Sequence, residues 1–352
     1  MYFIPTPTVS FNLNVALRII AALMVASIFL FLADNILIHW FDQPGLRVFL
    51  THTGVLPSEP DKEIDNQSLF GAWIQFSVFL TLIIGICIYC LTSSSRKIEQ
   101  DADMYSAIAA YIVRGAFWSV FLIGLTDMLI SFVRVEGFLS AIVGDHYATQ
   151  LGRSIFRGTY IHYPLIITGF FIAIFNRSLG FIWLALLIVA AEFLIVMTRF
   201  VFSYEQAFMG DLVRFWYAGL FLFASAYTLL NDGHVRVDVL YANFGPGTKA
   251  LTNIFGSLLL GLPLCWNILI QGMSGKASII NSPILSFEIS QSGFGMYTKY
   301  LMAGYLVIFA TSMGIQFTGF ILQNIATFKS RNLPDSDPDN LSMGMDNMEK
   351  VS

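Results

Sequence analysis

The chain has 352 residues, of which 56% are hydrophobic and only 12% are charged, and its mean hydropathy is strongly positive at +0.69. This composition is typical of proteins that cross a lipid bilayer several times, and it excludes a soluble enzyme. The net charge of -4 comes without a basic cluster, so nucleic acid is not expected as a partner. The sequence therefore predicts an all-α polytopic membrane protein.

Eight apolar segments are candidates for membrane-crossing helices, because a helix rises ~1.5 Å per residue and the hydrocarbon core is about 30 Å thick. They are apolar on all sides, as expected for helices surrounded by lipid. The segments are 13–33, 69–91, 107–132, 160–175, 179–201, 212–230, 250–271 and 297–324. The fourth is short, and a re-entrant helix is the alternative there. The expected interface anchors of the sixth segment are Phe215, Trp216, Tyr217 and Tyr227.

The connections between these segments also carry information. In residues 134–158, apolar and charged side chains alternate at helical spacing, which is typical of a helix that lies in the membrane interface. The charged members are Glu136, Asp145, Arg153 and Arg157. The short polar sequence 176–178 predicts that the fourth and fifth spans are antiparallel neighbours. The polar, acidic sequence 329–352 predicts a disordered tail.

Ionisable side chains inside apolar segments are costly in a bilayer, so each is a candidate functional residue. Glu192 lies near the middle of the fifth segment, and Arg199 follows two helical turns later on nearly the same face. The pair could bind a coupling proton or cation; the alternative, which we favour, is a buried polar contact that fixes helix packing. Arg114 and Asp127 of the third segment project to different sides. We expect each to meet a neighbouring helix or to reach the interface by snorkelling.

Motifs for catalysis or metal binding are missing from the sequence. Cys87 and Cys90 have CxxC spacing, but they lie within an apolar segment without a second pair, so we interpret them as small apolar helix residues. His162 is the one histidine near a span, which leaves a bis-histidine haem site without its second ligand. The sequence therefore predicts no enzyme activity, no cofactor and no metal. A membrane redox enzyme, which is a further alternative for the function, would show a visible cofactor spectrum.

Two polar segments on either side of the sixth span carry a family signature. The first begins with Arg199-Phe-Val-Phe-Ser and continues to an acidic residue followed by Leu, and the second is Asp-Gly-His-Val-Arg-Val-Asp at 232–238. Together they resemble the small integral-membrane, DctQ-type subunit of tripartite ATP-independent periplasmic (TRAP) transporters, in the branch linked to mannitol, chloroaromatic and 2-oxo acid uptake. Ser203, Phe208 and Asp211 stand where that family usually has Asn, Trp and Glu.

The resemblance covers roughly residues 180–325 and implies how the chain is organised. It implies a four-helix unit with both ends in the cytoplasm of a bacterial cell, within the inner membrane, and eight spans preserve that arrangement. Counts of Lys and Arg do not resolve the orientation, since they are equal on the two sides. We expect a membrane extension of about four helices at 1–178, the family's unit at 179–328 and the tail at 329–352.

The resemblance also implies a function. The chain would be a non-catalytic scaffold subunit that supports sodium-coupled uptake of an organic acid, in contact with membrane lipid. Its partners would be a large TRAP membrane subunit, which holds the ion and substrate sites, and a periplasmic substrate-binding protein. The positions that match the family motifs, and that we assign to architecture and subunit contact, are Arg199, Asp211, His234, Arg236 and Asp238.

An alternative function belongs to a different class. The chain could be a self-sufficient membrane carrier or channel in which the extra N-terminal helices complete a pathway through Glu192, Asp127 and Arg114. Such carriers usually hold their substrate between broken helices. The sequence gives no pair of such helices, and Pro263 is its one proline in the middle of a span.

Overall fold

The computed structural model describes residues 13–57, 65–177, 181–204, 206–230, 241–290 and 294–332. Within these ranges every regular element is helical and no strand occurs, which confirms the all-α prediction. In chain order the elements are α1 (Leu13–Trp40), α2 (Gly45–His52), α3 (Asn66–Thr92), α4 (Ile98–Val135), α5 (Leu139–Leu151), α6 (Ser154–Arg157), η1 (Gly158–His162), α7 (Tyr163–Phe175), α8 (Phe181–Val201), α9 (Ala207–Leu230), η2 (Tyr241–Asn243), α10 (Pro246–Gly256), η3 (Ser257–Gly261), α11 (Leu262–Gly272), α12 (Asn281–Ser286) and α13 (Lys299–Asn332).

Eight continuous helical stretches in the described ranges are long and apolar enough to cross a membrane, which confirms the predicted multi-pass protein. Six of them are the single helices α1, α3, α4, α8, α9 and α13. The other two are composite: α6, η1 and α7 form one span, and α10, η3 and α11 form another. The fourth span begins at Ser154 and has 22 residues. It is therefore longer than the segment 160–175 and has the length of a full crossing.

Both composite spans contain a π-helical turn just before a proline. Pro164 is the second residue of α7, and Pro263 is the second residue of α11. A proline in a helix has no N–H to donate, and its ring clashes with the carbonyl group four residues earlier. Those earlier residues, Tyr160 and Leu259, lie in the π turns η1 and η3. The wider turn accommodates the proline ring, so both spans continue without a break.

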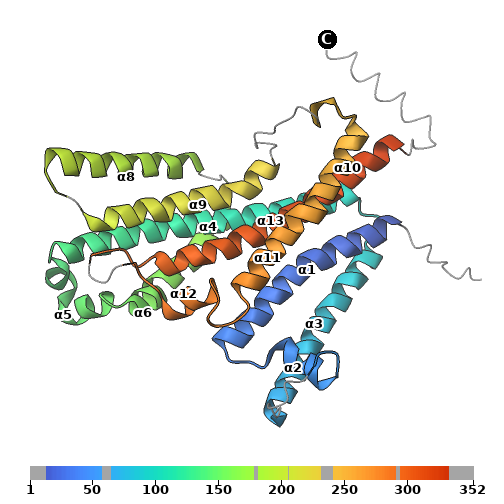
Figure 1. Cartoon of the computed structure of the whole chain (residues 1–352), viewed down its shortest axis with the longest axis horizontal. Helices are drawn as coiled ribbons and strands as arrows, with labels where there is room; N and C mark the ends of the chain where they lie inside the picture. The colour runs from blue at the N-terminus through green and yellow to red at the C-terminus, as the bar shows by residue number, and fades with distance from the viewer. Residues whose placement is uncertain are drawn as a thin grey trace, which may run out of the picture.

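Helices α4 and α13 form the centre of the bundle (Figure 1). Helix α4 packs against α13, α7 and α9, and α13 also packs against α9, α10 and α11. One apolar cluster contains buried side chains from both halves of the chain, such as Ile123 of α4, Phe215 of α9 and Leu322 of α13. The N-terminal and C-terminal spans therefore share a core. Helix α8, by contrast, packs against α9 at the edge of the bundle.

Two glycines allow helices to approach α4 closely. A Cβ atom on Gly169 of α7 would lie 2.6 Å from the backbone nitrogen of Ser119, and one on Gly124 of α4 would lie 2.2 Å from Nε1 of Trp216. Neither position has room for a larger side chain. Small residues at such contacts let membrane helices gain van der Waals packing, which is a main source of their association.

The two ends of the described chain lie on the same side of the bundle (Figure 1). The Lys329 ammonium group near the end of α13 donates a hydrogen bond to the side-chain oxygen of Asn14, at the start of α1. An even number of spans requires this arrangement. Residues 333–352, which include most of the expected tail, lie outside the described residues.

Two expectations about the membrane surface differ from the structure. Helix α5 is mostly exposed, but Arg157, which the sequence placed on the same interfacial helix, is fully buried at the start of the fourth span. Phe215 and Trp216, expected as interface anchors, are 0% and 2% exposed and belong to the core. The reason is packing between helices, because Trp216 lies against Gly124 of α4 and Phe215 lies against the ring of Tyr305 of α13.

Candidate functional site

A cluster of polar side chains lies between α4, the start of the fourth span and the segment before α13. We call it the buried junction and define it as Asp127, Ser131, Arg157, His162 and Tyr297, together with the residues that contact them. Asp127, Arg157 and His162 are each 0% exposed. Ionised groups are stable in such surroundings only when they are paired and hydrogen-bonded, so their partners define what the cluster does.

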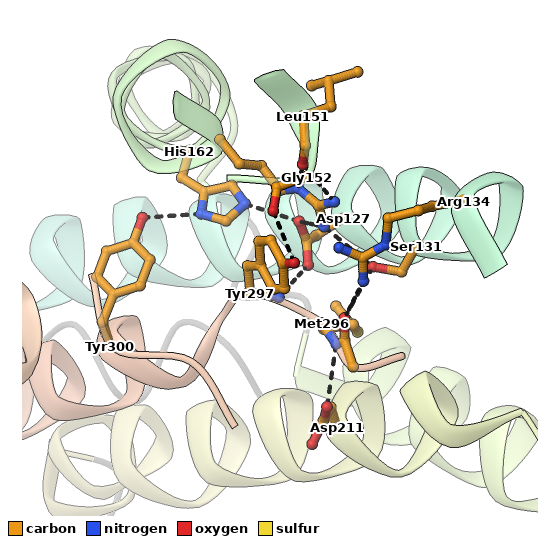
Figure 2. A network of polar contacts seen from close by, with 12 residues as sticks. Asp127, Ser131, Arg134, Leu151, Gly152, His162, Asp211, Met296, Tyr297 and Tyr300 are labelled. Atoms are coloured by element: carbon orange, nitrogen blue, oxygen red, sulfur yellow. Dashed lines mark hydrogen bonds and ion pairs between the residues drawn. The ribbon is translucent and has the colours of Figure 1, made fainter. Parts of the chain in front are cut away.

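The carboxylate of Asp127 is the centre of the buried junction (Figure 2). Its Oδ1 atom lies 2.8 Å from Nη1 of Arg157 and 3.1 Å from Nε2 of His162. Its Oδ2 atom accepts the backbone N–H of Tyr297 at 2.8 Å. The carboxylate therefore has one cationic, one imidazole and one backbone donor. Two of these donors come from the fourth span and one comes from the segment before α13, and together they are why the carboxylate can remain charged while it is buried.

The guanidinium group of Arg157 is enclosed on several sides. Its Nη1 donates to Asp127 and, at 3.1 Å, to the hydroxyl of Ser131. Its Nε and Nη2 atoms donate to the backbone carbonyl of Leu151 at 3.1 and 2.9 Å. Its central carbon lies 4.3 Å from the centre of the Tyr297 ring, a distance typical of cation–π contact. Arginine suits this position because its fixed fork can serve several acceptors at once.

His162 connects Asp127 to Tyr300 of α13. Its Nδ1 atom lies 2.9 Å from the Tyr300 hydroxyl, and the two rings are stacked. A carboxylate only accepts hydrogen bonds, so Nε2 carries the hydrogen that faces Asp127. In this tautomer of an uncharged ring, Nδ1 is the acceptor for the hydrogen of the Tyr300 hydroxyl. The result is a chain of hydrogen bonds from α13 through the fourth span to α4.

Residues 294–298 form a non-helical segment that is buried over 295–298. Backbone N–H and C=O groups at such a position need hydrogen-bond partners within the protein, because lipid cannot form these bonds and water is absent from a buried segment. Here two carboxylates from different helices provide them: Asp211 of α9 accepts the N–H of Met296 at 3.1 Å, and Asp127 of α4 accepts the N–H of Tyr297. In return, Arg134 donates to the carbonyl of Gly295 at 2.8 Å. This segment is thereby fixed against α4 and α9.

The chemistry of the buried junction is that of a structural connection. Asp127 and Arg157 compensate each other's charge, and both are enclosed. In the ranges that the structure describes, no group of three or more His, Cys, Asp or Glu side chains is placed to hold a metal ion. The described contacts connect the fourth span and α4 with the segment 294–300. They therefore join the N-terminal spans to the C-terminal ones.

A second buried ion pair lies near the other end of α4. Nε of Arg18, in α1, lies 2.6 Å from Oδ2 of Asp101, in α4. Arg96 approaches the other oxygen of Asp101 at 2.9 Å, and Arg18 also donates to the carbonyl of Ser93. This cluster fastens the first span to the connection between α3 and α4. The N-terminal spans are thus held at both ends of α4.

The candidate residues of α8 are placed differently. Glu192 and Arg199 are both exposed, and they lie on the helix that packs at the edge of the bundle. Neighbouring apolar side chains on α8 are also exposed: Val189 is 64% and Phe193 is 63% exposed. The structure therefore differs from the buried contact that we favoured for Glu192.

The remaining candidates have separate surroundings. Arg114 is partly buried in α4, and its Nε atom has no hydrogen-bond partner. Asp211 contacts Met296 and lies 3.9 Å from Arg214. The three candidates of the second signature segment, His234, Arg236 and Asp238, lie outside the described residues.

The structure does not gather Glu192, Asp127 and Arg114 into one site. Asp127 is enclosed by its own partners, and Glu192 is exposed on α8. Arg114 lies thirteen residues from Asp127 along the same helix, which corresponds to about 20 Å. A pathway that uses all three would need a different arrangement of the helices.

The sequence identifies Asp127 as a candidate but not its partners. The pattern places Arg157 on an interfacial helix, His162 enters only as a possible haem ligand, and Tyr297 and Tyr300 carry no signal. One signal was present: a cation and a histidine stand five residues apart near the start of an apolar span. The π turn between them has i to i+5 hydrogen bonds, and across it both side chains reach Asp127.

A comparison with protein-family models matches part of this chain. Residues 186–327 match the family model described as tripartite ATP-independent periplasmic transporters, DctQ component. The match begins within α8 and ends within α13, and it covers about two-fifths of the chain. It confirms the resemblance seen in the signature segments. No curated protein and no solved structure matches the chain.

Proposed function

We propose that this chain, whose residues 186–327 match the DctQ component of TRAP transporters, is the small membrane subunit of such a transporter. It works with a large membrane subunit and a periplasmic substrate-binding protein in the inner membrane of a bacterial cell. The complex takes up an organic acid by sodium symport, and the ion and substrate sites lie in the large subunit. Both ends of the described chain face the cytoplasm.

The observation that carries this proposal is where the match falls on the fold. The matched range contains most of α8 and all of α9, α10 and α11, and it ends near the end of α13. These helices form the last four spans. The matched range thus corresponds to a four-span unit, and the first four spans are an addition to it.

The exposed face of α8 supports a protein partner in the membrane. An ionisable group near the middle of a span is costly in contact with lipid, and such groups usually face protein or water. Glu192 lies at that depth and is exposed, with Arg199 two turns away. A large subunit that covers this face would remove Glu192 from lipid and provide a cation or a hydrogen-bond donor for it. Arg199 belongs to the same contact.

The buried junction and the shared core support a role as a scaffold. Asp127, Arg157 and His162 of the N-terminal spans contact Tyr297 and Tyr300, which lie in the matched range. The first four spans therefore enlarge a body whose two parts are connected by buried hydrogen bonds as well as by apolar packing. A transporter needs such a body, against which its moving part can work.

The proposal is tested by purifying the tagged chain from its native membrane in mild detergent and identifying the proteins that accompany it by mass spectrometry. We expect a large polytopic membrane protein in stoichiometric amount. Arg236→Ala and Asp238→Ala in the second signature segment should weaken this association without unfolding the helices. A chain that arrives alone as a stable oligomer would contradict the proposal.

Transport is tested in liposomes that contain this chain and its large partner, with the binding protein added outside. Uptake of the organic acid should require all three proteins and an inward sodium gradient, and it should stop when potassium replaces sodium. Liposomes with this chain alone are the control. Uptake by the chain alone would instead favour the self-sufficient carrier, and its loss in Glu192→Gln would assign that activity to α8.

A further inference from the structure

Two arginines lie near each other where the fourth and fifth spans meet. Arg177 follows α7, which ends at Phe175, and lies in the connection to α8. Arg114 is a residue of α4, and Arg177 lies close enough to repel its guanidinium group. We call these two residues the arginine pair. Charges of the same sign repel each other, and an anion between them would remove that repulsion.

The packing of α7 on α4 directs Arg114 toward the other member of the arginine pair. The two helices are antiparallel, because Ser119 of α4 contacts the carbonyl of Ile166, whereas Tyr111, two turns earlier in α4, contacts the carbonyl of Phe170. Side chains of a helix lean toward its N-terminus. Arg114 therefore leans along α4 in the direction in which α7 ends.

The surrounding chain provides no carboxylate for the arginine pair. The sequence has no Asp or Glu at 104–126, in α4, or at 146–191, which includes α7 and the first half of α8. Among the described residues, neither guanidinium group forms an ion pair or a hydrogen bond. The Nε atom of Arg114 is enclosed, so its terminal nitrogens are the donors that can reach a ligand. Arg18 and Arg157, by contrast, each contact a carboxylate of the chain.

The arginine pair belongs to a surface of the membrane. The fourth span ends at Phe175 and the fifth begins at Ile182, so Arg177 lies between two crossings. Residues that connect spans lie at the membrane surface, because backbone outside a helix is not stable among lipid tails. Apolar side chains beside the connection are exposed: Phe175 is 74%, Ile182 is 85% and Trp183 is 69% exposed. Cations beside exposed apolar side chains are typical of contact with anionic lipid.

We propose that the arginine pair binds the phosphodiester group of an anionic membrane phospholipid. A guanidinium group has a planar fork of N–H donors that matches two phosphate oxygens, so two arginines can enclose one phosphate. The headgroup carries a net negative charge, because the ammonium group of a zwitterionic lipid would be repelled by both arginines. The acyl chains lie outside the bundle, along the exposed apolar side chains of α7 and α8. The bilayer supplies the ligand, and the inference does not depend on the transport function.

Three variants of the full chain and one control test the proposal. Arg114→Gln and Arg177→Gln each remove one cation and keep a polar side chain. Arg177→Glu places a carboxylate beside Arg114 and so replaces the anion that the lipid would supply, which removes the repulsion within the chain. Arg153→Gln is the matched control, because Arg153 is an exposed arginine at the opposite end of the fourth span.

The measurement is native mass spectrometry of the purified chain in detergent micelles, titrated with dioleoyl phosphatidylglycerol, with dioleoyl phosphatidylethanolamine or with inorganic phosphate. We expect the wild type and Arg153→Gln to bind phosphatidylglycerol about tenfold more tightly than phosphatidylethanolamine. Each Gln variant should bind phosphatidylglycerol about tenfold more weakly than the wild type, because it lacks hydrogen bonds to a charged group. Arg177→Glu should bind the two lipids equally.

Three results would overturn the proposal. Equal affinity of the wild type for the two lipids would overturn the choice of an anionic headgroup. Binding of inorganic phosphate as tight as that of phosphatidylglycerol would show that the ligand is a soluble phosphate and not a lipid. Unchanged binding of phosphatidylglycerol in both Gln variants and in Arg177→Glu would overturn the assignment to the arginine pair.

Discussion

The buried junction and the outer face of α8 both place ionisable side chains in spans, but they do so in opposite ways. Asp127, Arg157 and His162 are fully enclosed, and each has partners from other elements. Glu192 and Arg199 are exposed at the edge of the bundle. In a membrane protein, ionised groups that are paired inside the bundle stabilise the fold. An ionisable group that faces outward in the middle of a span is costly in contact with lipid, so we expect it to contact another protein.

The first prediction breaks the buried junction at its centre. Asp127→Asn leaves Arg157 buried without its counter-ion, and we expect it to lower the free energy of unfolding by about 3–5 kcal/mol. Titration with a denaturing detergent, followed by tryptophan fluorescence, measures the change. Asp145→Asn on the exposed helix α5 is the matched control and should behave like the wild type. A loss below about 1 kcal/mol would show that the ion pair does not hold the spans together.

A double variant separates the charge from the packing at the same place. Asp127→Leu combined with Arg157→Met removes both ionised groups, so no charge stays buried without compensation. We expect the double variant to be more stable than Asp127→Leu alone, because the penalty comes mainly from the partner left behind. The same detergent titration measures this coupling, and simple additivity of the two single effects would contradict it.

A second prediction concerns the close contact of α7 and α4 at Gly169. In Gly169→Ala the added methyl group would lie 2.6 Å from the backbone nitrogen of Ser119, so the helices must separate. We expect a loss of about 1–3 kcal/mol in unfolding free energy. Gly85→Ala, in the open space beside α3, is the control and should not destabilise the chain. Equal stability of the two variants would mean that α7 is not closely packed.

A third and smaller effect is expected at the edge of the buried junction. Tyr300→Phe removes the hydroxyl that donates to His162 and leaves the ring and its stacking in place. The loss of one hydrogen bond should cost about 1 kcal/mol. If His162→Phe and Tyr300→Phe are combined, the double variant should lose less unfolding free energy than the sum of the losses in the two single variants. Strict additivity would show that the two side chains do not interact.

The smallest effect on stability is expected on α8, where the change should appear in association instead. Glu192→Gln should alter the unfolding free energy of the isolated chain by no more than about 0.5 kcal/mol, because the side chain is exposed. In the proposed complex, the same change should weaken binding of the large subunit more than tenfold, as expected for a charge buried at an interface. If Glu192→Gln lowers the unfolding free energy but leaves binding of the partner unchanged, then Glu192 is a structural residue like Asp127 and not a contact residue.

The sequence was sufficient to predict the spans, because length and apolar character are local properties. It was insufficient for the partners of Asp127, which lie 30, 35 and 170 positions away in the chain. Only the folded arrangement brings these positions together, and a single sequence records no such contact. The same limit applies to the pairing of Arg18 with Asp101.

The start of the fourth span shows why a local rule failed. The sequence predicts that the fourth span begins at residue 160, after Arg157, since an arginine in lipid is costly. In the structure its charge is compensated by Asp127, so the span includes it and begins at Ser154. Trp216 is a similar case, because its large ring fits against Gly124, on a helix almost one hundred residues earlier. Local patterns predicted the helices, and contacts between side chains of different helices decided which residues are buried.

The most direct test of this account is site-specific photo-crosslinking in the native membrane. A benzoylphenylalanine is placed at Phe193, which is 63% exposed beside Glu192 on α8, and in a second variant at Phe171, which is 60% exposed on α7. We predict that position 193 crosslinks to a large polytopic membrane protein and that position 171 gives at most lipid adducts. Crosslinking to that protein from position 171 but not from position 193 would show that the exposed face of α8 is not the contact surface.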